Sequence, residues 1–518
     1  MQPIAAPTTM KKIFLALALV SLVFSVACGS NGIGGLIGTG HYSNASLTGS
    51  YVYQITGYEF GSTGSPVQYQ ESGIFTANGH GVITGGSDDF AEETSGGVGS
   101  TPDTGTYSIG SDGTGTVTLT FPGAEGSISL DVTLVSTSKL YMIEADNANA
   151  TGVAEAQSST TLPTAATSFI FKEHSFSATH DFSSVGQLTL ATDGTVTGSD
   201  DVDREGLVNG GGGTTNPLAL TGSSLFNAPD STGRGTATLT DSTGTIDFIY
   251  YIVNSSNLRL MVSDAGVVGA GRAEAQTGQP FTTDPLSGNS FAFGSRADDA
   301  NAGPGAVNTV GSISASSGAI SGGLLDTAVD GVNAYASVPI NTGGTYTAVA
   351  ANGRTVLGFT TLAPLSSTVQ QVFWMVNPSR AFFLTTSDSS DITKIEDGTA
   401  DEQQGTFTNS SLNGQYAFSM DGYDNNAQVF VDRVGWIQWK GNGNLTWNEA
   451  VNNSGGISSS GGLSGTYTVG TNGRTTASVS NLSYNDNDIV FYLVSGSNAY
   501  ILENDAGVEI NGAMSQQQ

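Results

Sequence analysis

Few side chains in this sequence could carry chemistry. There are four histidines, His41, His80, His174 and His180, and one cysteine, Cys28. A catalytic nucleophile needs a base within hydrogen-bond reach, but His41 lies in a Gly/Ser-rich segment and His80 in an expected hairpin turn. His174 and His180 are six residues apart, so on one strand they would be about 20 Å apart, too far to share a metal ion. We therefore expect no catalytic residue and no histidine-bound metal.

Clustered carboxylates offer a second kind of chemistry. Asp88-Asp89 stand near Glu92-Glu93, and Asp200-Asp201 near Asp203. Oxygen-rich loops can hold Ca²⁺, which takes six to eight oxygen ligands, but neither cluster has the spacing of an EF-hand loop. Paired carboxylates also serve glycoside hydrolysis. The favoured interpretation is a solvated acidic loop with no cofactor, and Ca²⁺ is the alternative.

Three of the four tryptophans gather near the C-terminus. Trp436 is expected in a core, whereas Trp439 and Trp447 flank a hairpin turn at Asn442-Gly443. Flat rings on adjacent strands can form a platform for a sugar or an apolar ligand. The alternative is an aromatic pair that only stabilises the hairpin. Trp439 and Trp447 are the candidate ligand-binding residues.

Composition limits the class of protein. The 518 residues include 71 glycines and carry a formal net charge of −30, with only 12% charged residues. The acidic balance argues against binding nucleic acid, which needs a basic surface. Ser, Thr, Gly and Asn are abundant, as is typical of short strands joined by tight turns. We expect an all-β protein whose charge favours solubility.

The N-terminal segment has the pattern of an export signal. Lys11-Lys12 precede an apolar run from Ile13 to Val26, which is too short for a comfortable membrane span. Ser25-Val26-Ala27-Cys28 resembles the lipobox of bacterial lipoproteins. That resemblance implies lipidation of Cys28, a membrane anchor, and a cell-envelope location at the outer membrane or cell surface. An ordinary secreted, cleaved signal is the alternative.

The rest of the chain is built from four long repeats. A strand-ending motif recurs as Leu134-Val135-Ser136, Ile252-Val253-Asn254, Met375-Val376-Asn377 and Leu493-Val494-Ser495, at steps of 118, 123 and 118 residues. A period this long is that of a whole domain, not of a solenoid coil. The expected organisation is a signal peptide at 1–27, a flexible tether at 28–44, and β-repeats at 45–158, 166–277, 285–398 and 409–518.

Each repeat reads as about eight strands. In the first, Ile128, Leu130, Val132 and Leu134 alternate with polar residues, which indicates a strand with one buried face. Asn-Gly and Asp-Gly pairs mark hairpin turns between such runs. A meander of eight strands can close into a small antiparallel barrel without exposed edges. Four tandem barrels are predicted, and a β-sandwich is the alternative.

The leading Leu-x-Gly-x-Tyr, as in Leu47 to Tyr51, and the later Gly-Thr-Tyr, as in Gly105 to Tyr107, resemble those of tandem-repeat bacterial lipoproteins. That family is mostly of unknown function and supplies no catalytic residues. The resemblance covers the first and fourth repeats best.

Together these features predict a non-enzymatic, lipid-anchored envelope protein acting as a surface spacer, adhesin or binding array, because repeated modules allow avidity. Its partners would be the membrane, through the anchor, and a glycan or a surface protein. The rival interpretations are a carbohydrate-binding protein that uses the fourth repeat, and a secreted hydrolase.

Overall fold

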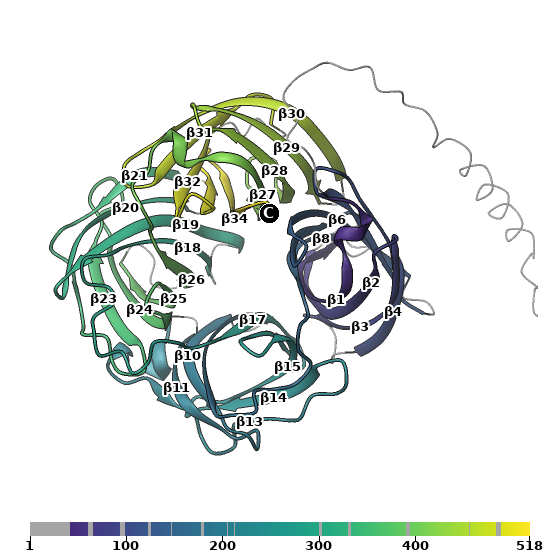
Figure 1. The fold of residues 1–518 in the computed structure, drawn as a ribbon. Helices are drawn as coiled ribbons and strands as arrows, with labels where there is room; N and C mark the ends of the chain where they lie inside the picture. The colour runs from purple at the N-terminus through teal and green to yellow at the C-terminus, as the bar shows by residue number, and fades with distance from the viewer. Residues whose placement is uncertain are drawn as a thin grey trace, which may run out of the picture. The chain divides into compact units, whose positions relative to one another are not determined.

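The computed structural model describes residues 42–518 apart from 61–65, 94–98, 123–125, 147, 178–180, 205, 212, 300–302, 330–332, 390–393, 455 and 483–487. The compact unit spans Gly40–Gln518, and it is an all-β structure of four successive antiparallel sheets, barrels 1 to 4 (Figure 1). Cys28 lies outside the described residues.

Barrel 1 is a closed meander of eight strands. All eight runs expected from alternation are strands, and the predicted barrel is confirmed in place of the sandwich. A short 3-10 turn, η1 (Asn44–Ser46), precedes the strands: β1 (Thr48–Phe60), β2 (Pro66–Asn78), β3 (Val82–Glu92), β4 (Gly99–Ile109), β5 (Thr114–Thr120), β6 (Ser127–Ser136), β7 (Lys139–Glu144) and β8 (Ala148–Ala156).

Barrel 2 is the open member of the set. Its sheet runs from β12 to β13 without pairing these two short strands, and one isolated bridge, Thr195↔Leu225, lies beside the gap. The glycine-rich stretch after β11 forms 3-10 turns. Its elements are β9 (Thr167–Ser177), β10 (Phe182–Leu190), β11 (Val196–Arg204), η2 (Val208–Gly211), η3 (Gly213–Thr215), β12 (Leu218–Ala219), β13 (Leu225–Phe226), β14 (Arg234–Thr240), β15 (Thr245–Asn254), β16 (Asn257–Val262) and β17 (Val267–Ala275).

Barrel 3 closes through the pairing of β19 with β20, and β21 is added outside the circuit. Its last strand continues past residue 398, where the sequence suggested a linker. The strands are β18 (Ser290–Asp299), β19 (Gly303–Ser316), β20 (Ala319–Val329), β21 (Asn333–Ile340), β22 (Thr345–Tyr346), β23 (Arg354–Thr360), β24 (Thr368–Asn377), β25 (Arg380–Asp388) and β26 (Lys394–Glu402).

Barrel 4 repeats the closed eight-stranded meander of barrel 1. The turn η4 (Asn409–Ser411) precedes β27 (Asn413–Asp424), β28 (Val429–Lys440), β29 (Asn444–Asn453), β30 (Gly456–Val469), β31 (Arg474–Val479), β32 (Asp488–Leu493), β33 (Asn498–Glu503) and β34 (Val508–Gln516).

Each barrel encloses its own packed apolar core. In barrels 1 and 4 the tyrosine of the Gly-Thr-Tyr motif joins the turn at the start of the repeat to that core. Tyr107 of Gly-Thr-Tyr donates to the backbone oxygens of Asn44 and Leu47, and Tyr467 donates to those of Asn409 and Leu412. These motifs therefore hold the fold together.

A glutamine at the end of each repeat fastens it to the next one. In every case the side-chain amide donates to two backbone oxygens, one in the β4–β5-type turn and one at the end of the β6-type strand. We call this contact the Gln latch. Its members are Gln157 on Thr232 and Ile252, Gln276 on Asn352 and Met375, Gln403 on Asn472 and Leu493, and Gln517 on Asp112 and Leu134.

The last Gln latch joins barrel 4 back to barrel 1, so the four interfaces form a closed cycle of contacts. The turn glycine is required there. Gly113 has φ +86°, and a Cβ on it would lie 2.7 Å from Gln517 Nε2. Only glycine allows both the left-handed backbone and the close approach.

A buried ion pair joins barrels 1–2, 2–3 and 3–4. An arginine that opens one strand forks onto an aspartate of the preceding barrel, and an aromatic N–H or O–H donates to the same carboxylate. We call this set the Arg–Asp latch. It comprises Arg234 and Tyr251 on Asp89, Arg354 and Trp374 on Asp201, and Arg474 and Tyr492 on Asp326.

The aspartates of this latch have no exposed side-chain surface. Burying a carboxylate is costly unless it is paired and hydrogen-bonded, and each receives the two donors of a guanidinium together with an aromatic donor. Burial and the neighbouring aspartate raise the pKa of Tyr251 and of Tyr492 well above the usual range, so both remain donors.

Apolar side chains surround these polar contacts at all four interfaces. At the 1–2 interface Val52 and Ile74 pack with Ile249, Tyr251 and Met261. Equivalent clusters lie at the 2–3, 3–4 and 4–1 interfaces. The four barrels are thus packed against one another through apolar side chains of each. Among the described residues no helix is long and apolar enough to cross a bilayer.

Candidate ligand-binding site between the barrels

A cavity of about 440 Å³ lies where the four barrels meet. Barrel 1 contributes β1, β2, β7 and β8, barrel 2 β9 and β17, barrel 3 β18 and β26, and barrel 4 β27, β28, β33 and β34. Its lining includes Tyr58, Asn149, Lys172, His174, Arg296, Asp397, Ser419, Asp421, Phe430 and Tyr500. Since no single repeat supplies more than part of this wall, the site depends on the assembly.

One wall is a charge cluster across the 2–3 interface. Asp397 of β26 accepts from Lys172 Nζ at 2.5 Å and contacts His174 Nδ1 at 2.6 Å, both on β9. Burial alone would raise the pKa of Asp397, but Lys172 and His174 hold it well below its usual range. The cluster is therefore an ionised carboxylate between two basic side chains.

Barrel 4 adds a second polar group. Arg296 Nη1 of β18 lies 2.7 Å from Asp421 Oδ2 of β27, and Asn149 Nδ2 of β8 donates to Asp432 Oδ2 at 3.0 Å. Burial, with a smaller contribution from Asp421, raises the pKa of Asp432 well above the usual range. Burial thus disfavours the charged form of Asp432, in contrast to Asp397, whose charged form is stabilised by its basic neighbours.

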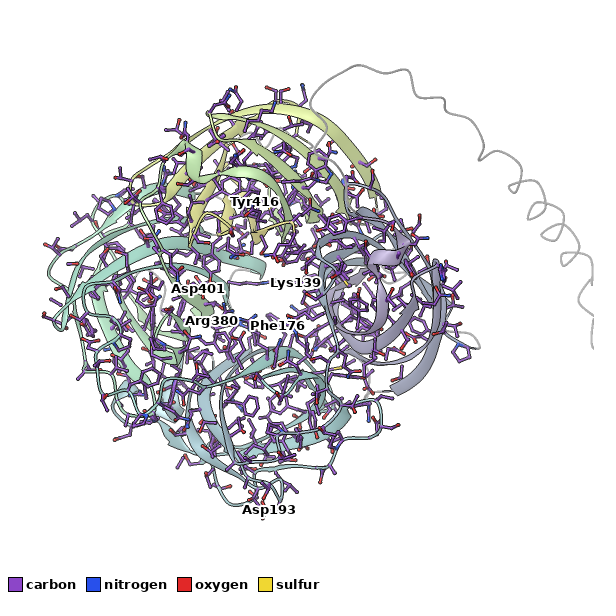
Figure 2. All side chains as sticks on the ribbon, viewed as in Figure 1. Lys139, Phe176, Asp193, Arg380, Asp401 and Tyr416 are labelled. Atoms are coloured by element: carbon purple, nitrogen blue, oxygen red, sulfur yellow. The ribbon has the colours of Figure 1, made fainter. Side chains whose placement is uncertain are left out.

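An extended ion-pair chain runs beside the cavity. Arg380 and Asp401 lie close together (Figure 2), with Arg380 Nη1 3.0 Å from Asp401 Oδ1 and Arg380 Nε 3.0 Å from Glu274 Oε2. Tyr500 donates to Asp401 Oδ2 at 2.6 Å. Barrels 2, 3 and 4 meet in this chain, which holds the cavity walls in register.

Aromatic rings form the apolar part of the lining. Tyr58 of barrel 1 stacks on Phe430 of barrel 4 with 3.9 Å between ring centroids, and Tyr423 meets the same ring edge-on at 5.0 Å. The exposed fractions of Tyr58 and Phe430 are 8% and 6%. A wall with flat rings on one side and hydrogen-bonding groups on the other is suited to a small polar molecule with an apolar face.

The tryptophans predicted to form a platform lie elsewhere. Trp439 and Trp447 have 0% exposed surface and sit inside barrel 4, packed on Tyr467, Phe491 and Phe418. The expected hairpin is present, but an open platform is wrong because both rings face the lumen. A shift of one residue in strand register moves a side chain from one face of the sheet to the other. The sequence alone did not show whether these two rings point into the barrel or out of it.

The acidic residues predicted to lie in solvated loops are strand residues. Asp88, Asp89, Asp200, Asp201 and Asp203 are buried, and that prediction is wrong because Asp89 and Asp201 bind arginines of the next barrel. No group of three or more metal-ligating side chains occurs among the described residues. Within those residues nothing suggests where Ca²⁺ would bind.

The structure describes two of the four histidines, and it places them differently. His80 is exposed in a turn, as expected, whereas His41 and His180 lie outside the described residues. His174, for which the sequence indicated no role, has a side chain that is 14% exposed and lines the cavity. Neighbouring residues could not have predicted this position of His174, because its partner Asp397 is 223 positions away in the sequence.

Sequence reasoning also missed both latches. A signal for them existed, because Arg234, Arg354 and Arg474 follow the turn glycine in three repeats, and a glutamine directly follows the last strand of every repeat. Recurrence at fixed repeat positions distinguishes these residues from scattered surface polar residues.

Comparisons with known proteins add little. No family model matches this chain, and no curated protein matches it. Similar solved structures include intact Ap-TbpB with its N and C lobes (9% identity, covering 75% of this chain and 86% of that chain, TM-score 0.17). Transferrin binding protein B from Haemophilus parasuis matches at 11% identity over 69% and 76% of the two chains, TM-score 0.17. The isotype 1 protein from serogroup B Neisseria meningitidis matches at 10% over 69% and 77%, TM-score 0.19. These scores are too low to support any argument about fold or function.

Proposed function

We propose that this chain is a non-enzymatic, lipid-anchored protein of the cell envelope whose four barrels act together as one binding body. The observation that carries the proposal is the shared cavity, whose wall is drawn from all four barrels. A spacer made of independent modules would need neither the latches nor a common cavity. The binding role is therefore favoured over the spacer role.

The state of the charges in the cavity favours binding over catalysis. Lys172 and His174 share Asp397, and Arg296 is paired with Asp421. A general base needs a pKa near the working pH and a proton to abstract within reach. Here the basic groups are held in ion pairs, which suits a rigid polar wall. A hydrolase thus receives no support from this site.

The ligand that fits best is a small sugar. The volume of about 440 Å³ lies within the range of small-molecule sites, and the half-buried Tyr423 ring in the lining offers a face on which a pyranose ring can stack. The carbohydrate-binding interpretation therefore moves from Trp439 and Trp447 to this cavity. A surface protein as partner, as in an adhesin, remains the alternative to be tested beside it.

A thermal-shift screen of the full chain against mono- and disaccharides tests the ligand class. A binding sugar should raise the melting temperature in a concentration-dependent way, and Tyr423→Ala should remove that shift. Phe182→Ala, which alters a barrel 2 ring outside the cavity, should leave the shift intact. A hit that survives Tyr423→Ala, or a complete absence of hits, contradicts the sugar-binding proposal.

The anchor needs its own experiment. Mass spectrometry of the mature N-terminus should show an acylated Cys28, and the protein should partition into detergent. Cys28→Ser should abolish both properties while leaving the folded region unchanged. A free N-terminus at any other residue would overturn the lipid anchor and leave the binding body as a secreted protein.

A further inference from the structure

The fourth interface lacks the Arg–Asp latch that joins the other three. Strand pairing identifies the positions: Arg234↔Tyr251, Arg354↔Trp374 and Arg474↔Tyr492 are cross-strand neighbours, and their counterpart in barrel 1 is Thr114↔Thr133. The barrel on the other side of each interface supplies the latch aspartate. Asp201 is the cross-strand neighbour of Val185, and the residue at the same position in barrel 4 is Ala450, the neighbour of Val434. Arginine, aromatic donor and aspartate are thus all replaced at once.

A fourth replacement introduces a charge. In barrels 2, 3 and 4 the residue two positions before the aromatic donor is aliphatic and packs in the interface cluster. These residues are Ile249, Val372 and Val490. Barrel 1 has Asp131 at this position. An aliphatic contact has been exchanged for a carboxylate at the one interface that has lost its arginine.

The replaced residues surround a cavity of about 530 Å³ between barrels 4 and 1. Thr114, Asp131, Thr133 and Ala450 line it, together with serines of β30. We call it the 4–1 cavity. It lies apart from the central site, since none of these residues lines the latter.

Two groups in this cavity lack partners among the described residues. Thr133 is 1% exposed, and its hydroxyl makes no hydrogen bond within that part of the chain. Asp131 is half-buried, takes part in none of the described ion pairs or hydrogen bonds, and has its pKa raised by burial. By contrast, the nearby acids are occupied: Asp112 accepts from Trp436, and Glu449 accepts from Arg433 and Trp447.

We propose that the 4–1 cavity binds a small organic cation with a guanidinium-type head. The other three interfaces bury a guanidinium between barrels, against a carboxylate. At the fourth, the chain supplies a carboxylate, a free hydroxyl acceptor and space, but no arginine. A planar cation with several N–H donors matches a carboxylate and neighbouring hydroxyls better than a point charge does.

Calorimetry on the full chain tests this with three probes that share a 4-aminobutyl chain: agmatine, the analogue with a neutral urea in place of its guanidinium, and 1,4-diaminobutane, which has an ammonium in that place. We expect saturable binding of agmatine, with the other two weaker by about tenfold or more. Asp131→Asn should weaken agmatine binding by a similar factor, and Asp247→Asn, an exposed acid of barrel 2, should not. Equal binding of 1,4-diaminobutane, or unchanged binding of agmatine in Asp131→Asn, overturns the proposal.

A second variant keeps the test decisive if Asp131→Asn does not fold. The double change Thr114→Arg with Ala450→Asp rebuilds the missing latch in the cavity. It should abolish agmatine binding and raise the melting temperature of the unliganded chain. Agmatine binding that persists in this variant, or no agmatine binding by the unmodified chain, contradicts the assignment.

Discussion

The side-chain amide of Gln517 donates to the backbone oxygen of Leu134 at 2.6 Å, across 383 positions of sequence. Gln157, Gln276 and Gln403 make the equivalent contact between consecutive barrels. The contact of the last barrel with the first therefore uses the same chemistry as those between neighbours along the chain, and it closes the four barrels into one body.

Gln517→Ala should lower the free energy of unfolding by about 1–3 kcal/mol, since it removes two hydrogen bonds and leaves two carbonyl groups without that donor. Chemical denaturation of the full chain measures the loss. Gln438→Ala, which removes only a bond to the adjacent Trp439 backbone, is the control and should cost clearly less. Equal effects would mean that the closing contact adds no stability.

Arg474→Met should destabilise the chain by about 3–5 kcal/mol, because it leaves the fully buried carboxylate of Asp326 without its cation. Replacing both residues, as Arg474→Met with Asp326→Leu, should recover most of this loss, because no uncompensated charge then remains. Denaturation curves of the two variants, with exposed Asp488→Asn as control, check the claim. A double variant less stable than the single one would contradict it.

Trp439→Ala and Trp447→Ala should each cost about 3–5 kcal/mol, as expected for large core side chains. Trp436→Phe should cost less, because that indole is half-buried and loses only its bond to Asp112. Thermal melts of the three variants distinguish core from platform. A small loss for Trp439→Ala would revive a ligand-binding role for that ring.

Stability should fall as pH rises from about 5 to 8. Burial raises the pKa of Glu71 to about 8, and those of Asp103, Glu173 and Asp203 to about 7. The folded state therefore binds more protons than the unfolded state between the unfolded pKa near 4 and these values, so raising the pH favours unfolding. Melting temperatures from pH 5 to 8 measure the slope, and Glu71→Gln should reduce it. A flat or rising profile would contradict the assignment.

Residues 409–518 alone should fold cooperatively, because barrel 4 closes on itself around its own core. The fragment should be less stable than the full chain, since Ala417, Val434, Val490 and Tyr492 lose their covering neighbours. Circular dichroism and urea titration test both points. A disordered fragment would show that the barrels share one inseparable core.

Local sequence patterns predicted the strands and the turns, because these features depend on residues that are close together in the sequence. Alternation of the Ile128–Leu134 kind gave strand positions, and Asn-Gly pairs gave turns, because side-chain period and turn chemistry act over a few residues. Asp89 was misjudged because its partner, Arg234, is 145 positions away, and an acidic pair without its cation resembles a solvated loop. The cavities escaped prediction for the same reason, since their walls come from different repeats.

The closing contact is tested most directly by a cysteine pair across it. Thr151 Oγ1 of barrel 1 lies 2.9 Å from Ser419 Oγ of barrel 4, so the side chains at these two positions meet across the closing interface. In a Cys28→Ser background, Thr151→Cys with Ser419→Cys should oxidise within one chain, as seen by non-reducing electrophoresis and peptide mass spectrometry. Thr151→Cys paired with Ser223→Cys on barrel 2 should not. Failure of the first pair to link within the chain, or linking of both pairs alike, would contradict the closed assembly of four barrels.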